Sequence, residues 1–204
     1  MDIIKNKINM IYQEKIFTKE ECDKILSYTK IYTDLPFREL ESNLDLDNRR
    51  INQFTKMENG KKLGKFFNVW DIVNDTESEW MFEKLFNWFS VVSKIERNPN
   101  NKPTGCSLHK YSKGDSFMKH KDYNEKWPNR RWNLGIQLNE DYTGGEYICY
   151  DTNDKEIVLS KEVGTAIAYD ASTFHEIKEI VDGERLSIVL TILKKDILEK
   201  MHLI

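Results

Sequence analysis

The stretch Phe117-Met118-Lys119-His120-Lys121-Asp122 lies in the second half of a 204-residue chain and decides how the rest is interpreted. Its first residues are typical of a short β-strand, and side chains two positions apart on a strand point to the same face. His120 and Asp122 can therefore reach one metal ion, while Lys121 points away. A second histidine, His175, begins a later predicted strand and can supply a third ligand. Two imidazoles and one carboxylate suit ferrous iron and leave coordination positions open.

Short strand-like runs surround this stretch, with turn residues between them. The runs are residues 107–111, 117–120, 132–138, 146–150, 156–159, 166–169, 175–180 and 186–193. Turn signals include Gly144-Gly145 and Asp182-Gly183. About eight short strands with frequent turns predict an antiparallel sandwich or jelly roll.

The first hundred residues are dominated by helical patterns. Thr18 and Glu21 form a capping box, which predicts a helix over residues 18–30. Between this helix and the next, residues 34–66 are weakly patterned, and we expect a short hairpin with mobile loops. Such a segment serves either as a lid over a substrate or as a solvated surface excursion.

A second helix is predicted from a capping box at Thr76 and Glu79, and it should end near Pro99 because proline stops a helix. Its apolar residues follow helical spacing and predict a buried stripe against the sheet. The stripe consists of Met81, Leu85, Trp88, Val92 and Ile95. The fold class is therefore α+β and mainly β, with N-terminal helices packed on one sheet of the jelly roll.

The composition limits the classes of function to consider. The length suits one domain, which we divide into a helical support and substrate-loop region, 1–100, and a catalytic core, 104–194. A formal charge of −3, from 31 basic and 34 acidic residues, is not typical of proteins that bind nucleic acid or anionic membranes. Three separated cysteines predict no disulfide framework, and no signal peptide or membrane span is apparent. We expect a soluble cytoplasmic protein and make no prediction of its oligomeric state.

Arg185 lies ten residues after His175, in a strand that is otherwise apolar. A buried guanidinium needs a partner, and a carboxylate that accepts two hydrogen bonds is the best one. That carboxylate comes either from a protein acid or from a bound diacid, and Ser187 on the same strand face can add a hydroxyl. An isolated His-x-Asp pattern is common by chance, so the combination carries the prediction. His109 and His202 are interpreted as structural or exposed histidines.

Together these residues resemble the iron(II) and 2-oxoglutarate dependent dioxygenases, specifically the prolyl 4-hydroxylase-like family. That family has a double-stranded β-helix core behind N-terminal helices, a His-x-Asp…His triad, and a basic residue one strand beyond the distal histidine. It also has a tyrosine shortly before the first histidine, and Tyr111 occupies that place. Gly144-Gly145-Glu146 resembles the family's Gly-Gly-Glu turn. The resemblance covers about residues 14–194.

The resemblance implies a role for each residue of the site. The implied iron ligands are His120, Asp122 and His175. The implied cosubstrate contacts are Arg185, which would pair with the distal carboxylate of 2-oxoglutarate, Tyr111, Ser187 and Gln137. The implied catalytic set is the three ligands together with Arg185. The implied cofactors are Fe(II), 2-oxoglutarate and O2, with ascorbate as an optional addition. Because a halogenating relative would need an open coordination position where Asp122 stands, hydroxylation is favoured over halogenation.

The implied function is oxidation of a C–H bond coupled to decarboxylation of 2-oxoglutarate. The resemblance favours a prolyl residue in a peptide or protein as the substrate. The loop 123–132 follows the first two ligands, and its aromatic and arginine side chains could line a peptide groove or pack at a rim. One alternative is a hydroxylase of a free amino acid or other small metabolite. A second is a non-catalytic metal-binding jelly-roll module, against which Arg185 and Tyr111 argue. We expect neither nucleic acid nor a membrane as a partner.

Overall fold

The computed structural model describes residues 10–33, 45–46, 49–58, 61–73, 76–101, 105–123, 125 and 127–198. The helices are α1 (Lys19–Thr33), α2 (Glu79–Ser93) and the 3-10 helix η1 (Lys194–Asp196). The strands are β1 (Ile11–Lys15), β2 (Asp45–Leu46), β3 (Arg49–Glu58), β4 (Lys61–Val73), β5 (Glu96–Arg97), β6 (Gly105–Ser112), β7 (Phe117–His120), β8 (Arg130–Gln137), β9 (Thr143–Gly144), β10 (Tyr147–Tyr150), β11 (Glu156–Val158), β12 (Thr165–Asp170), β13 (His175–Ile177), β14 (Ile180–Asp182), β15 (Glu184–Leu193) and β16 (Ile197–Leu198).

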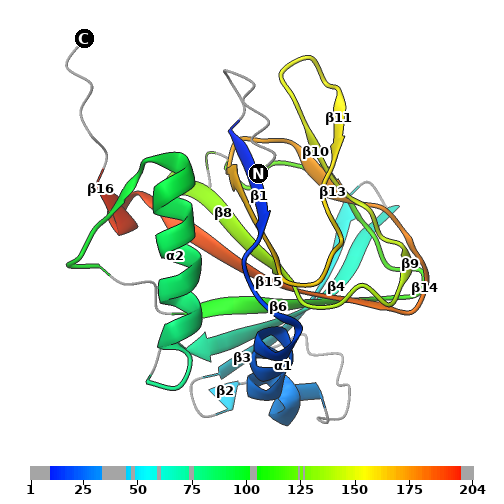
Figure 1. Cartoon of the computed structure of the whole chain (residues 1–204). Coiled ribbons are helices and arrows are strands. Elements are labelled where there is room, and N and C mark those ends of the chain that lie inside the picture. Colours follow the sequence, from blue (N-terminus) through cyan, green and yellow to red (C-terminus); the bar gives the residue numbers. More distant parts are fainter. Residues whose placement is uncertain are drawn as a thin grey trace.

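Most strands join one antiparallel sheet in the order β1-β12-β8-β15-β6-β4-β7-β13-β10-β11, and β3 pairs with β4. The two ends of this order face each other. Arg185 on β15 lies 5.3 Å from the ring of Tyr147 on β10, and the ring of Tyr169 on β12 lies 4.9 Å from that of His175 on β13. The sheet is therefore rolled around an interior, with α1 and α2 outside it (Figure 1). This confirms the jelly-roll prediction.

Strand alternation divides the central strands between two buried environments. On β15, Ile188, Leu190 and Ile192 face the cluster beneath α2, whereas Arg185 and Ser187 face the interior of the roll. Because successive side chains point to opposite faces, one strand can serve a hydrophobic core and a polar pocket at once. The same division on β8 puts Trp132, Leu134 and Ile136 in the core beneath α2.

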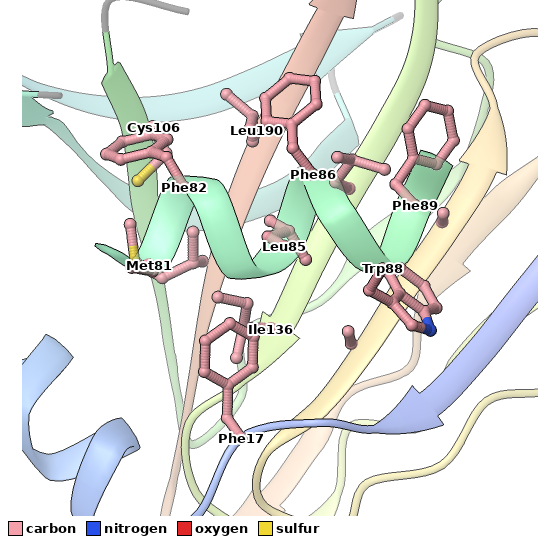
Figure 2. Close-up of a cluster of buried hydrophobic side chains, with 14 of the residues drawn as sticks. Phe17, Met81, Phe82, Leu85, Phe86, Trp88, Phe89, Cys106, Ile136 and Leu190 are labelled. Atoms are coloured by element: carbon pink, nitrogen blue, oxygen red, sulfur yellow. The ribbon is translucent and has the colours of Figure 1, made fainter. Parts of the chain in front are cut away.

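Helix α2 lies across the sheet and buries a wide aromatic face against it (Figure 2). The predicted stripe is confirmed for its first three members, while Val92 and Ile95 are only partly buried. Three phenylalanines widen the buried face beyond the prediction. The buried residues of α2 are Met81, Phe82, Leu85, Phe86, Trp88 and Phe89. Full burial of each large side chain contributes about 1.5–3 kcal/mol, so this face is a main source of stability.

Both predicted boundaries of α2 are wrong. The helix begins at Glu79 after Ser78, whose side chain makes no capping hydrogen bond, so the capping box at Thr76 does not form. It ends at Ser93 because Lys94 adopts a left-handed conformation with φ 60°, and its backbone N–H bonds the carbonyl of Ser90. The chain then enters β5 well before the proline.

The first helix agrees with its prediction. The backbone N–H of Glu21 donates to Thr18 Oγ1 over 3.2 Å, and the backbone N–H of Thr18 donates to Glu21 Oε2 over 2.8 Å. This reciprocal pair is the predicted capping box. Among the described residues, no helix is both long and apolar enough to cross a lipid bilayer.

The expectation of a mainly helical first half is wrong. β1 pairs with β12 at one edge of the sheet, and β4 lies between β6 and β7. The predicted short hairpin is a long one, because β3 and β4 have ten and thirteen residues. Residues 34–44, also expected in mobile loops, lie outside the described part of the chain, as does His202.

Candidate metal centre and anion pocket

Three predicted metal ligands converge at the end of β7. β13 pairs with β7 so that His175 lies opposite His120, and Asp122 follows β7. Asp122 Oδ1 is 3.6 Å from His120 Nε2, and Asp122 Oδ2 is 3.5 Å from His175 Nε2. The potential ligand atoms of all three residues lie within 4.8 Å of one another. Sequence spacing predicted this cluster, and strand pairing assembles it.

Backbone carbonyl groups fix the orientation of both imidazoles. His120 Nδ1 lies 2.7 Å from the carbonyl oxygen of Met118, and His175 Nδ1 lies 3.0 Å from that of Thr173. When Nδ1 donates to a carbonyl oxygen, the neutral ring keeps its lone pair on Nε2. The Nε2 atoms are also those nearest Asp122, so both rings present a ligand atom to the same point.

The carboxylate of Asp122 is held from the opposite wall of the roll. Asn133 on β8, which is buried, donates from Nδ2 to Asp122 Oδ2 over 2.6 Å, and Arg130 donates to Oδ1 over 3.5 Å. Thr191 donates in turn to Asn133 Oδ1 over 3.3 Å. Burial alone would raise the pKa of Asp122, but the hydrogen bond with His120 and the charges of the neighbouring groups hold it below its usual range. Asp122 is therefore ionised and suited to bind a metal ion.

The cluster is partly exposed to solvent. The side chain of His175 is 6% exposed, whereas those of His120 and Asp122 are 18% and 21% exposed. Burial lowers the pKa of His175 to about 4, which keeps this imidazole neutral. The loop after Asp122 exposes Trp127, whose ring lies 5.1 Å from the guanidinium carbon of Arg130. The exposed ring of Trp127 therefore contacts Arg130, which in turn contacts the carboxylate of Asp122.

Arg185 lies deep in the interior and is 2% exposed. It donates to Ser187 Oγ over 2.9 Å and to Gln137 Oε1, and its Nε–H has no hydrogen-bond partner among the described residues. These partners are neutral, and no carboxylate in the described part of the chain forms an ion pair with Arg185. The alternative in which a protein acid supplies the carboxylate is therefore not realised there. The pocket retains an uncompensated positive charge.

Tyr111 lies directly opposite Arg185 on the neighbouring strand β6, and its ring is 5.7 Å from the guanidinium carbon. The ring packs with Tyr142, Ile177 and Ile180. Tyr111, which the resemblance implied as a cosubstrate contact, adjoins Arg185 but is not among the residues that line the small pocket beside the guanidinium. The pocket is lined by residues 134–137, Tyr147, Ile167, Tyr169, Arg185 and 187–189.

Three residues near the site were missed by sequence reasoning. His109, interpreted as an ordinary structural or exposed histidine, lies opposite Ser187, and its ring is 6.4 Å from that of Tyr111. Tyr147 and Tyr169 line the pocket, and burial raises the pKa of both phenols well above the usual range. A tyrosine in a short apolar strand resembles a core residue. The signal that could have found Tyr147 is its place directly after the Gly-Gly-Glu turn.

The residues present fit a metal ion and an organic acid. Two imidazole nitrogens and a carboxylate are a donor set that binds ferrous iron on one face. The unpartnered Nε–H of Arg185 shows that the protein itself leaves the guanidinium incompletely paired. A carboxylate bound beside Arg185 would complete this arrangement.

Comparison with known families agrees with this geometry. Residues 106–192 match the model of the 2OG-Fe(II) oxygenase superfamily, and this span includes all three candidate ligands and Arg185. The match agrees with the resemblance found in the sequence at the level of the superfamily. Fe(II), 2-oxoglutarate and O2 are the cofactors that the superfamily implies. No curated protein shows a significant sequence match to the chain.

Solved structures with the same fold include several oxygenases. A 2OG-Fe(II) oxygenase family oxidoreductase from Burkholderia pseudomallei has a TM-score of 0.64 at 15% identity, covering 91% of this chain and 86% of its own. A prolyl-4-hydroxylase from Pseudomonas putida has a TM-score of 0.61 at 13% identity, covering 88% and 89%. A Trichoplax adhaerens prolyl hydroxylase, in complex with a hypoxia inducible factor peptide fragment, has a TM-score of 0.58 at 14% identity, covering 92% and 84%. At these identities the likeness shows the fold.

Proposed function

We propose that this protein is an iron(II) and 2-oxoglutarate dependent dioxygenase that hydroxylates a C–H bond. The observation that carries the proposal is the convergence of His120, Asp122 and His175 in the same rolled sheet that buries Arg185 without a carboxylate partner among the described residues. When bound, the metal and 2-oxoglutarate supply the oxidation, in which one oxygen atom of O2 enters succinate and the other enters the substrate, with release of CO2.

The side chains divide this task between them. His120, Asp122 and His175 would hold the iron on one face, and Asn133 keeps the carboxylate in place. Arg185 would grip the distal carboxylate of 2-oxoglutarate. The further cosubstrate contacts that we propose are Ser187 and Gln137, which line the pocket, and Tyr111, whose ring lies 5.7 Å from the guanidinium carbon outside that lining. Ser187 and Gln137 already orient the guanidinium, so they preorganise the anchor before the acid binds.

A prolyl residue in a peptide or protein is the substrate that we propose first. Two of the neighbouring structures are prolyl hydroxylases by name, and one of them holds a peptide. In this chain the exposed rings of Tyr123 and Trp127, 41% and 49% exposed, lie on the loop that follows Asp122. Exposed aromatic side chains beside an active site suit an extended substrate. A free amino acid or other small metabolite remains the alternative substrate.

A peptide array tests the substrate. Purified protein with Fe(II), 2-oxoglutarate and ascorbate is incubated with proline-containing peptides, and products are read as a mass gain of one oxygen together with succinate. We expect a subset of peptides to be modified. Modification of free amino acids without any peptide product would favour the metabolite alternative.

A binding measurement separates the oxygenase from a non-catalytic metal module. The proposal predicts that the metal-loaded protein binds 2-oxoglutarate and that Arg185→Met weakens this binding about 100-fold, because charge-assisted hydrogen bonds are lost. Lys161→Met, at a lysine whose amino group contacts Tyr142 and lies outside the pocket lining, is the control. A protein that binds metal but shows no affinity for 2-oxoglutarate would contradict the enzyme proposal.

We also propose that the chain acts as one dioxygenase domain, 1–204, in the cytoplasm. The regions 1–100 and 104–194 share a sheet, since β4 of the first lies between β6 and β7 of the second. We expect a single cooperative unfolding transition in calorimetry, whereas two separate transitions would contradict the single domain. Imaging of the tagged protein in cells tests the compartment.

A further inference from the structure

Two tyrosines that sequence reasoning did not select meet inside the roll. The hydroxyl groups of Tyr147 on β10 and Tyr169 on β12 hydrogen-bond each other. The ring of Tyr147 lies 5.3 Å from the guanidinium carbon of Arg185, and the ring of Tyr169 lies 4.9 Å from that of His175. The pair therefore spans the interior between the anion anchor and a metal ligand.

One of the two hydroxyl hydrogens in this tyrosine pair is not used in the hydrogen bond between them. Two phenol groups carry two O–H hydrogens, and their mutual hydrogen bond uses one of them. The other has no acceptor among the described residues, and the Nε–H of Arg185 has none there either. Both tyrosines and Arg185 line the same pocket. Buried donors without acceptors cost free energy, so a pocket with two of them is suited to an acceptor-only ligand such as a carboxylate.

Tyr147 is the better placed of the two to meet that ligand. Its ring lies 5.3 Å from the guanidinium carbon of Arg185 and 6.0 Å from the ring of His175, whereas the ring of Tyr169 is nearer to His175, at 4.9 Å. Tyr147 also follows the turn Gly144-Gly145-Glu146, whose glycines have φ of 70° and 66°, a conformation that other residues rarely adopt. The turn and the hydroxyl of Tyr169 together hold the Tyr147 phenol in one place.

We propose that Tyr147 is a cosubstrate-binding residue whose hydroxyl donates a hydrogen bond to the carboxylate that Arg185 holds, with Tyr169 as the residue that positions it. This inference rests on the proposed function and adds a contact to it. Arg185 and Tyr147 then approach one carboxylate as a charged donor and a neutral donor. Tyr169 does not contact the carboxylate in this proposal. Its hydroxyl fixes the direction of the Tyr147 hydroxyl.

The test is the affinity for 2-oxoglutarate of the Mn(II)-loaded protein, measured by titration calorimetry, because manganese avoids turnover. Tyr147→Phe removes one oxygen atom and keeps the ring, and we expect binding about tenfold weaker, as for loss of one hydrogen bond to a charged group. Tyr169→Phe should weaken binding less. Tyr150→Phe is the matched control, because Tyr150 lies on the same strand but bonds Glu176 outside the pocket.

Affinity for Mn(II) alone, followed by electron paramagnetic resonance, separates the proposed contact from a general disturbance. We expect it to be unchanged in Tyr147→Phe. An unchanged affinity for 2-oxoglutarate in Tyr147→Phe would overturn the role of Tyr147. So would a loss of Mn(II) affinity as large as the loss of 2-oxoglutarate affinity. If the wild-type protein does not bind 2-oxoglutarate at all, the proposed function fails as well, so the two failures are distinguishable.

Discussion

The two faces of the central strands β8 and β15 are both buried, but one face is apolar and the other carries polar and charged side chains. Beneath α2, the apolar side chains of Ile136 and Leu190 pack with the phenylalanines of the helix (Figure 2). On the inner face of the same strands, Gln137 and Arg185 meet around a pocket in which the Nε–H of the guanidinium has no partner among the described residues.

This difference indicates that the outer face stabilises the fold, whereas the inner face holds the groups proposed to bind the metal and the acid. Burial of apolar surface stabilises the protein, whereas a buried charge without a counter-charge destabilises it. The stability gained beneath α2 therefore offsets the cost of keeping Arg185 and the proposed metal ligands in place. Substitutions on one face should affect stability, and those on the other should affect binding and turnover.

The largest expected effect is on the inner face. His175→Ala removes a ligand that is almost fully buried, and we expect succinate formation to fall below detection. Phe174→Ala, at the exposed neighbouring residue, is the control and should keep metal binding. Because the apolar face is unchanged, circular dichroism should show His175→Ala folded. Turnover that survives in His175→Ala would refute the assignment of the ligand.

The next effect is on the outer face. Phe86→Ala leaves a cavity beneath α2, where the side chain is 1% exposed, and should lower the free energy of unfolding by about 3–5 kcal/mol. Urea denaturation measures the loss. The affinity of the folded protein for 2-oxoglutarate should stay within error of wild type. A large loss of affinity at temperatures where the variant is folded would show that the two faces are coupled.

A smaller effect is expected where the inner face only supports a ligand. Asn133→Ala removes the 2.6 Å hydrogen bond to Asp122, and metal affinity should fall about 10–100-fold, as is typical when a partner of a ligand is lost. Asn139→Ala is the control, because Asn139 bonds the backbone of Glu184 and Leu186 outside the metal cluster. Equal metal affinity in Asn133→Ala and Asn139→Ala would contradict the proposal that Asn133 supports metal binding through Asp122.

The smallest expected effect is a loss of stability from a substitution at the start of α1, outside both faces. Thr18→Ala removes the hydroxyl that accepts from the Glu21 backbone at the start of α1, and should cost about 1 kcal/mol of stability. Thermal unfolding should show a modestly lower midpoint with unchanged 2-oxoglutarate binding. Thr18→Ser retains the hydroxyl and should behave as wild type, and a similar loss in both variants would argue against the capping role.

Local patterns predicted the parts of the fold whose causes are local. The capping box at Thr18 forms as predicted, and β7 has the boundaries that the sequence indicated. The ends of α2 were missed because the left-handed turn at Lys94 stops the helix before proline can do so. The lengths of β3 and β4 were missed because their pattern is weak, and pairing with β6 rather than local propensity extends the sheet there.

Some residues of the candidate site could be predicted from the sequence, and others could not. The spacing of His120 and Asp122, and the distance along the chain to His175 and Arg185, were sufficient to predict a metal site and an acid anchor. Tyr147 and Tyr169 could not be selected, because a tyrosine in an apolar strand has the same local pattern whether it packs in a core or lines a pocket.

By itself, the sequence determined the chemistry of this protein: which side chains could bind a metal or an acid, and which short segments would be strands. Only the tertiary structure decided which of those side chains meet. Strand pairing places His175 opposite His120, and the rolling of the sheet brings Tyr147 to Arg185. The physical reason is that residue type and spacing are local properties, whereas contacts across a rolled sheet depend on which faces of distant strands are buried together.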